Sequence, residues 1–248
     1  MNKTIKKQLE HKTIREFKDI VIDSNTLKNL YDVANRTPTS IGMQSFSLIR
    51  VVDKEKRRAI SEVCKQDYVR TAPELFIFIV DIFRNSKVAE EMGGNIDNAG
   101  NMDKFFQGVT DAILAAQNTY TAIESLDLGG VFLGSILNDS EKMIEILELP
   151  KLTFPILGLA FGYPNQEPQL KPRMDISLKV FEDRYMIQDS YLDKIKNYDE
   201  EMKKYYDLRD TSKPLNSFSK QVVSFLSSYN ENRVRILHVA KKQGFYIL

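Results

Sequence analysis

The chain has 248 residues, of which 42% are hydrophobic and 10% aromatic, and its formal net charge is +1. This composition is typical of a folded protein with a sizeable core and excludes a disordered chain. The small net charge excludes a general attraction to nucleic acid or to an anionic membrane. No apolar run reaches the length of about 18 residues that a transmembrane helix needs. The lysine-rich start lacks the apolar stretch of a secretory signal.

Hydrophobic periodicity predicts helices and strands that alternate along most of the chain. The expected helices cover residues 4–9, 25–35, 54–65, 105–126, 141–149, 191–206, 217–229 and 233–242. The expected strands cover residues 46–52, 75–83, 129–133, 154–163 and, at an edge, 178–185. Residues 85–102 mix glycine, asparagine and charge, which predicts a short helix and a mobile loop.

This order of elements predicts a mixed fold of strands and helices with a helical C-terminal part. We expect a core at residues 1–189 and a helical excursion at residues 190–248. The helix at 105–126 carries apolar residues on more than one face, which suits either a domain centre or a subunit interface. The only cysteine, Cys64, cannot form an internal disulfide, so we expect a reducing, cytoplasmic location.

The sequence contains no Walker loop, zinc-type Cys/His set, nucleophile elbow or dinucleotide fingerprint. One candidate functional site is the cluster His11, Lys12, Thr13 and Arg15, which offers several hydrogen-bond donors to a bound anion. The alternative is a solvated basic turn. A second candidate is Lys171-Pro172-Arg173, where proline fixes the backbone between two cations. An ordinary exposed loop is the alternative there.

Two further stretches suit a flat ligand. Glycines in the run 128–135 permit close approach of the backbone, although tight packing explains them equally well. The run 37–40 is a short polar loop with three hydroxyl groups, for which a plain turn is the alternative.

In this order and spacing, these four pieces resemble the oxygen-insensitive nitroreductase and flavin reductase family, in its larger, NADPH-preferring branch. The family opening His-Arg-Ser-x-Arg corresponds to residues 11–15, and the serine-rich loop corresponds to residues 37–40. Further matching pieces are Gln66-Asp67-Tyr68-Val69, Ala115-Ala116-Gln117-Asn118, Glu124-Ser125-Leu126, the run 128–134, Gly162-Tyr163-Pro164 and Leu170-Lys171-Pro172-Arg173. The resemblance covers about residues 4–210.

The resemblance implies an α+β fold: a three-layer sandwich whose mostly antiparallel sheet is flanked by helices, in an interlocked homodimer. It also implies a bound flavin mononucleotide (FMN) at the subunit interface. The flavin phosphate would contact His11, Thr13, Lys171 and Arg173, while Lys12 stands where the family has arginine. The ring would contact Arg15, Gln66, Phe132, Leu133, Gly134 and Ser135, with Thr39 and Ser40 from the second subunit.

The electron donor implied by the resemblance is NADPH or NADH. Arg209 follows the pair Tyr205-Tyr206, as does the arginine that holds the extra phosphate of NADPH in the related branch. Asp207 and Asp210 flank it and weaken its attraction for a phosphate, so NADPH is only slightly favoured.

Three functions remain open on the sequence. The first is reduction of nitroaromatics, quinones or related acceptors by two-electron, ping-pong hydride transfer through the FMN N5 atom. The second is a flavin reductase that supplies free reduced flavin. The third is a flavin-binding sensor or carrier without turnover. We expect no metal and no side chain that acts as a nucleophile, because the cofactor supplies the chemistry.

Overall fold

The computed structural model describes residues 1–208 and 214–246. Contacts divide the chain into two compact units, Met1–Gln166 with Asn230–Leu248, and Glu167–Tyr229. Each unit is described by itself. The expected division after residue 189 stays a prediction.

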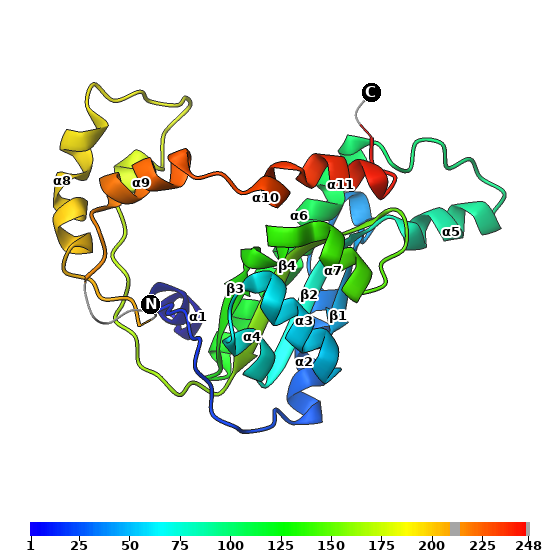
Figure 1. Cartoon of the computed structure of the whole chain (residues 1–248), viewed down its shortest axis with the longest axis horizontal. Coiled ribbons are helices and arrows are strands. Elements are labelled where there is room, and N and C mark those ends of the chain that lie inside the picture. Colours follow the sequence, from blue (N-terminus) through cyan, green and yellow to red (C-terminus); the bar gives the residue numbers. More distant parts are fainter. Residues whose placement is uncertain (209–213, 247–248) are drawn as a thin grey trace. The chain divides into compact units, whose positions relative to one another are not determined.

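A four-stranded sheet forms the centre of the first unit (Figure 1). Its strands are β1 (Phe46–Arg50), β2 (Glu74–Asp81), β3 (Gly129–Leu133) and β4 (Thr153–Gly162). They lie in the order β1-β2-β4-β3, and every neighbouring pair is antiparallel. Strand β2 is buried along its whole length, in agreement with its continuous apolar sequence. The predicted α+β class with an antiparallel sheet is therefore confirmed.

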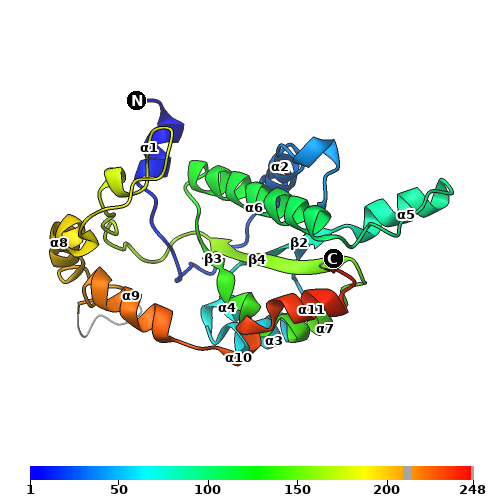
Figure 2. The ribbon, with the colours of Figure 1, turned by 90° about the horizontal axis from the view of Figure 1, so that it is seen from above.

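Helices cover both faces of the sheet (Figure 2). Helices α2 (Ser24–Asn35) and α6 (Met102–Ser125) lie over one face, and α3 (Lys54–Cys64), α4 (Tyr68–Thr71) and α7 (Ser140–Ile146) lie over the other. Side chains alternate between the faces of β2, as the pleat of a strand requires. Phe76 and Phe78 join the core under α2 and α6, whereas Leu75 and Ile77 join the core under α3.

Side-chain caps fix where the main helices begin. The carboxylates of Asp23 and Asp53 accept the backbone N–H groups of Thr26 and Lys56 at the starts of α2 and α3. Asn101 accepts from Lys104 N in the same way at the start of α6. These residues satisfy N–H groups that have no partner within the helix, so they set the helix boundaries locally.

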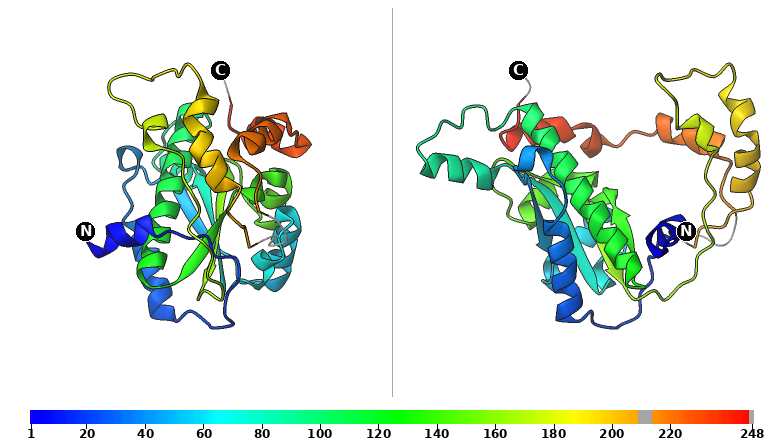
Figure 3. Two further views of the ribbon diagram at one scale, coloured as in Figure 1. Left: turned by 90° about the vertical axis from the view of Figure 1, so that its left-hand side faces the viewer. Right: turned by 180° about the vertical axis from the view of Figure 1, so that it is seen from behind.

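Shorter elements complete the first unit. They are α1 (Lys3–Leu9), α5 (Phe83–Glu91), α10 (Glu231–Val234), α11 (Ile236–Lys242) and the 3₁₀ turns Ser40–Gly42 and Gly134–Asp139. Helix α5 extends away from the sheet, and α6 runs along it (Figure 3). The expected helix at 233–242 is divided at Arg235 into α10 and α11. No helix of the described residues has both the length and the hydropathy needed to cross a membrane.

The second unit contains α8 (Tyr191–Met202), α9 (Phe218–Ser227) and the 3₁₀ turn Ile176–Leu178. Asp199 on α8 accepts hydrogen bonds from the backbone N–H and hydroxyl of Ser219 on α9, at 2.9 Å and 2.5 Å. The predicted edge strand at 178–185 is wrong. In the described part of this unit the segment turns through bends and pairs with no strand. A strand needs a neighbour for its backbone N–H and C=O groups, and hydrophobic residues alone do not supply one.

Helix α6 packs closely against the sheet at Gly108. A Cβ atom there would lie 2.7 Å from Val80 Cγ1 and 2.9 Å from the carbonyl oxygen of Ser45. We expect Gly108→Ala to lower the free energy of unfolding by about 1–3 kcal/mol, because the gain in helix propensity is smaller than the overpacking penalty. Urea unfolding of the purified protein measures this change.

Gly134→Ala is the matched control, because a Cβ atom there would meet nothing within 4 Å. Its unfolding midpoint should stay close to that of the parent. Equal midpoints for the two variants would contradict the close helix-sheet contact.

Candidate functional site

The first candidate segment, residues 11–15, runs beside strand β3. Ile14 N donates a 2.9 Å hydrogen bond to Gly130 O, and Arg15 N donates a 2.7 Å bond to Gln166 Oε1. Farther along, Phe17 forms a β-bridge with Pro164. The segment is therefore fixed as an extra backbone edge next to β3. Lys12, Thr13 and Arg15 are all partly accessible from this position.

His11 meets the last turns of α6. Its Nδ1 atom lies 2.7 Å from Glu124 Oε1, and its ring packs edge-on against Tyr120 with centroids 5.4 Å apart. The Tyr120 hydroxyl donates a 2.9 Å bond to Gly130 O. Burial raises the pKa of Tyr120, and the neighbouring Glu124 carboxylate raises it further, so the hydroxyl remains a donor at neutral pH.

Two other candidates, Gln66 and Ser135, meet at the opposite end of β3. Gln66 Oε1 accepts hydrogen bonds from the Tyr68 hydroxyl at 2.7 Å and from Ser135 Oγ at 3.3 Å. The Gln66 backbone is held as well, because Ser61 Oγ donates to its carbonyl oxygen at 3.0 Å. The structure thus brings together two residues that are 69 positions apart in the sequence.

Strand β3 connects the residues around His11 to the pair Gln66 and Ser135. Phe132 packs against Tyr120 with centroids 4.9 Å apart, and Leu133 is buried. The Gly134 backbone borders open space, because a Cβ atom added there would meet nothing within 4 Å. Gly130 and Gly134 are four residues apart, which corresponds to about 13 Å along a strand. This spacing suits an elongated ligand with an anionic group near His11 and a flat polar group near Gln66.

Arg233 is a residue of this region that the sequence did not indicate. Its Nη1 atom donates to Gly134 O at 2.9 Å and to Asn138 Oδ1 at 3.2 Å. The arginine lies on α10, almost one hundred residues after the turn that it holds. No local sequence motif marks it, so only the fold reveals the contact.

The polar loop with Thr39 and Ser40 is held by α6. The buried carboxylate of Asp111 accepts Ser40 N at 2.8 Å and Ser45 N at 2.9 Å. Asp111 precedes Glu124 by 13 positions on the same helix, which corresponds to about 20 Å. A single chain therefore does not bring Thr39 and Ser40 to the group around His11.

The remaining candidates lie elsewhere in the chain. Lys171 and Arg173 belong to the second unit, where Arg173 Nη1 donates to the carbonyl oxygens of Lys171 and Pro172 at 3.1 Å and 3.2 Å. Their expected meeting with His11 stays a prediction. Arg209 lies outside the described residues.

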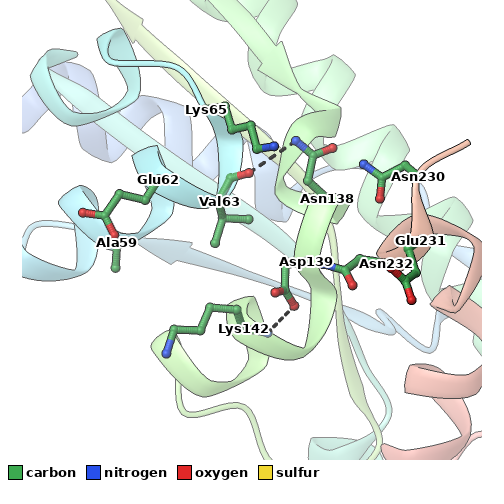
Figure 4. Close-up of a pocket in the computed structure, with 10 residues that line it drawn as sticks. All are labelled: Ala59, Glu62, Val63, Lys65, Asn138, Asp139, Lys142, Asn230, Glu231 and Asn232. Carbon is green, nitrogen blue, oxygen red and sulfur yellow. Dashed lines mark hydrogen bonds between the residues drawn. The ribbon is translucent and has the colours of Figure 1, made fainter. Parts of the chain in front are cut away.

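A polar hollow of about 550 Å³ adjoins the Gln66 end of the site (Figure 4). Lys65, Asn138 and the start of α10 line it, and Asn138 Nδ2 donates to Val63 O at 3.3 Å across its wall. The lining contains two lysines, Lys65 and Lys142, and three carboxylates, Glu62, Asp139 and Glu231. The hollow has no cationic excess, so it does not suit a phosphate group.

The described residues contain a single thiol, that of Cys64, and no cluster of possible metal ligands. Within residues 1–208 and 214–246, no three His, Cys, Asp or Glu side chains gather as metal ligands. Burial raises the pKa of the Cys64 thiol, which therefore stays protonated at neutral pH and is a poor nucleophile.

Comparisons with known proteins identify similar proteins over almost the whole chain. A family model described as "Nitroreductase family" matches residues 9–163, and one described as "Nitroreductase family, C-terminal domain" matches residues 171–247. An "FMN reductase (NADPH)" of Bacillus subtilis is 33% identical over 99% of both chains. An "Oxygen-insensitive NADPH nitroreductase" of Salmonella typhimurium is also 33% identical over 99% of both chains.

Solved structures give the same result. The NfrA1 nitroreductase of B. subtilis superposes with a TM-score of 0.90 at 32% identity, covering 98% of each chain. The "NADPH:FMN oxidoreductase from Vibrio harveyi complexed with NAD+" superposes with a TM-score of 0.87 at 30% identity. That comparison covers 98% of this chain and 99% of the other.

The Asp111 carboxylate gives a test of how the polar loop is held. In Asp111→Asn, one of the two loop N–H groups loses its acceptor, because an amide has a single oxygen. We expect the free energy of unfolding to fall by about 1–3 kcal/mol. The Ser40 and Ser45 amides should also exchange hydrogen faster, as measured by hydrogen exchange at residue resolution.

Asp103→Asn is the matched control, because this exposed carboxylate on the same helix binds the Gln107 side chain at 2.8 Å, whereas the Ser40 and Ser45 amides donate to Asp111. Unchanged loop exchange in Asp111→Asn would show that the carboxylate does not hold the loop.

Proposed function

The chain belongs to the nitroreductase family, and we propose that it is an FMN-dependent NAD(P)H oxidoreductase that reduces nitroaromatics, quinones or related small acceptors. The observation that supports this proposal is that two groups of candidate residues lie along β3, one around His11 and one around Gln66 and Ser135. Relatives that match the full chain are named for FMN and NADPH, which supports the same cofactors here.

The residues present fit FMN. The open backbone at Gly134 leaves room for the flat ring, and Gln66 and Ser135 supply polar groups beside it. The donors near the other end of β3 suit a phosphate, which accepts charge-assisted hydrogen bonds. In the proposed site the phosphate contacts His11, Thr13, Lys171 and Arg173, with Lys12 as a further cofactor-binding residue, and the ring contacts Arg15, Gln66, Phe132, Leu133, Gly134 and Ser135.

When bound, FMN would supply two-electron hydride chemistry at N5 between the nicotinamide donor and the acceptor. The chain itself binds and orients the cofactor and tunes its potential. Arg15 carries a permanent charge, so it favours the more negative, reduced ring. A preference of about 2 kcal/mol would raise the two-electron potential by about 45 mV. No side chain needs to act as a nucleophile.

A homodimer completes this proposal. Helix α6 exposes the large apolar side chains of Phe106, Ile113 and Leu114, and Ile41 beside the polar loop is 80% exposed. Such apolar surface is typical of an interface. In the dimer, Thr39 and Ser40 of each chain approach the flavin site of the other. This arrangement accounts for the distance of about 20 Å along α6 between Asp111, which holds the loop, and Glu124, which contacts His11.

The preferred electron donor is proposed to be NADPH. The named relatives support it, since several are called NADPH-dependent enzymes. Arg209 is the proposed contact for the extra phosphate, and it lies outside the described residues. Cytoplasmic location stays a prediction from the single cysteine.

A second candidate function is reduction of free flavin for use by another enzyme. It is favoured by relatives named "FMN reductase (NADPH)" and "NADPH-flavin oxidoreductase". The two activities use the same site and differ in the acceptor. A flavin carrier without turnover is less well supported, because these relatives carry names of enzymes.

The purified protein should show the visible absorbance of FMN, either as isolated or after incubation with excess FMN. Anaerobic addition of NADPH should bleach this band, and addition of a quinone or a nitroaromatic should restore it, as alternating half-reactions require. Absence of flavin absorbance after incubation would refute the proposed function. A parallel titration with NADH compares the two donors.

The two-chain site is tested with heterodimers purified through two different tags. Arg15→Glu and Ser40→Trp should each abolish flavin-dependent activity as homodimers, the first by charge and the second by bulk. A heterodimer of the two variants should regain about half of the parent activity, because one of its two symmetric sites carries neither change. An inactive heterodimer would place both residues in one chain's site.

A further inference from the structure

A carboxylate in the last turn of α6 occupies an electrostatically unfavourable position. Glu124 is the residue before the final residue of the helix, where the macrodipole disfavours negative charge. Its side chain is 12% exposed, so water solvates it poorly. Its hydrogen-bond partner is His11, whose Nδ1 atom lies 2.7 Å from Glu124 Oε1.

The contact determines which protons His11 carries. Nδ1 faces a carboxylate, which only accepts hydrogen bonds, so Nδ1 holds a proton. A neutral imidazole has one proton, which leaves Nε2 as an acceptor. A fully ionised phosphate also offers only acceptors. His11 therefore donates to Glu124 and to a phosphate at the same time only as the doubly protonated imidazolium ring.

We propose that Glu124 is a positioning residue that fixes the His11 ring through Nδ1, so that Nε2 faces the FMN phosphate and, in the imidazolium form, donates a charge-assisted hydrogen bond to it. This inference rests on the proposed function of the site. It assigns to Glu124 a role in selecting FMN over flavins that lack the phosphate.

The hydrogen bonds of the neighbouring groups explain why we assign this positioning role to Glu124. The Tyr120 ring packs against His11, but its hydroxyl is committed to Gly130 O at 2.9 Å. Lys7 on α1 is paired with Asp127, beyond the end of α6. Arg15 lies close enough to Tyr120 to influence that hydroxyl electrostatically, and Lys12 is the cation next to His11 in the sequence.

Simple charge repulsion predicts the opposite effect of Glu124. A carboxylate near a phosphate repels it, so removal of this charge should tighten FMN binding. If Glu124 acts through His11, its removal weakens FMN binding instead. The sign of the change therefore separates the two explanations.

The test compares Glu124→Gln with Asp127→Asn, which removes the same charge three positions later without touching His11. Kd values for FMN and for riboflavin are measured by quenching of flavin fluorescence on titration of the apoprotein. We expect Glu124→Gln to weaken FMN binding about fivefold to tenfold, because a neutral hydrogen bond replaces a charge-assisted one. Riboflavin binding should stay unchanged in this variant, and Asp127→Asn should leave the Kd for FMN within about twofold of the parent.

A double-mutant cycle tests whether the effect passes through the histidine. In a His11→Gln background, Glu124→Gln should no longer weaken FMN binding, since the group that it orients is absent. Equal weakening of FMN and riboflavin binding would show a merely structural role and overturn the inference. Unchanged or tighter FMN binding in Glu124→Gln would overturn it as well, while leaving the proposed function intact. Failure of the parent protein to bind FMN would instead refute the proposed function.

Discussion

The carbonyl oxygen of Gly130 accepts two hydrogen bonds, and the arrangement of the candidate site depends on both. Ile14 N and the Tyr120 hydroxyl each donate to it at 2.9 Å, so one oxygen ties the N-terminal segment and α6 to strand β3. Only glycine at 129 and 130 permits this approach. A Cβ at Gly129 would lie 2.5 Å from Ile14 Cγ1, and one at Gly130 would lie 3.1 Å from Tyr120 Cε2. The glycine pair is therefore explained by packing as well as by ligand access.

Helix α6 sets the distance between the two halves of the proposed flavin site. Its C-terminal turns position His11 through Glu124 and Tyr120, and an earlier turn positions the polar loop through Asp111. Because a helix is stiff, these attachments stay about 20 Å apart. In a symmetric pair of chains, each α6 would then support one part of both sites. Mutations that shift this helix would affect both sites together.

The sequence predicted much of the first unit because its signals are local. The apolar run of β2 and its flanking turns identify a buried strand without other information. The end of that strand was placed two residues too far, since the Asp81 carboxylate accepts Arg84 N at 3.0 Å and begins a helical turn there. The segment 178–185 was misread because strand formation depends on a neighbour. The Gln66–Ser135 contact and the Arg233 bonds join distant parts of the chain, and no single-sequence pattern encodes them.

The burial of Cys64 affects how its thiol responds to the peroxide that the proposed reaction can produce. Reduced flavin that meets oxygen generates hydrogen peroxide, which oxidises exposed thiolates to sulfenic acid. Cys64 is 3% exposed, and burial keeps its thiol protonated, although Ser135 next to it belongs to the candidate ring site. The one sulfhydryl of the chain is thus shielded from oxidative damage at the place where peroxide would first appear.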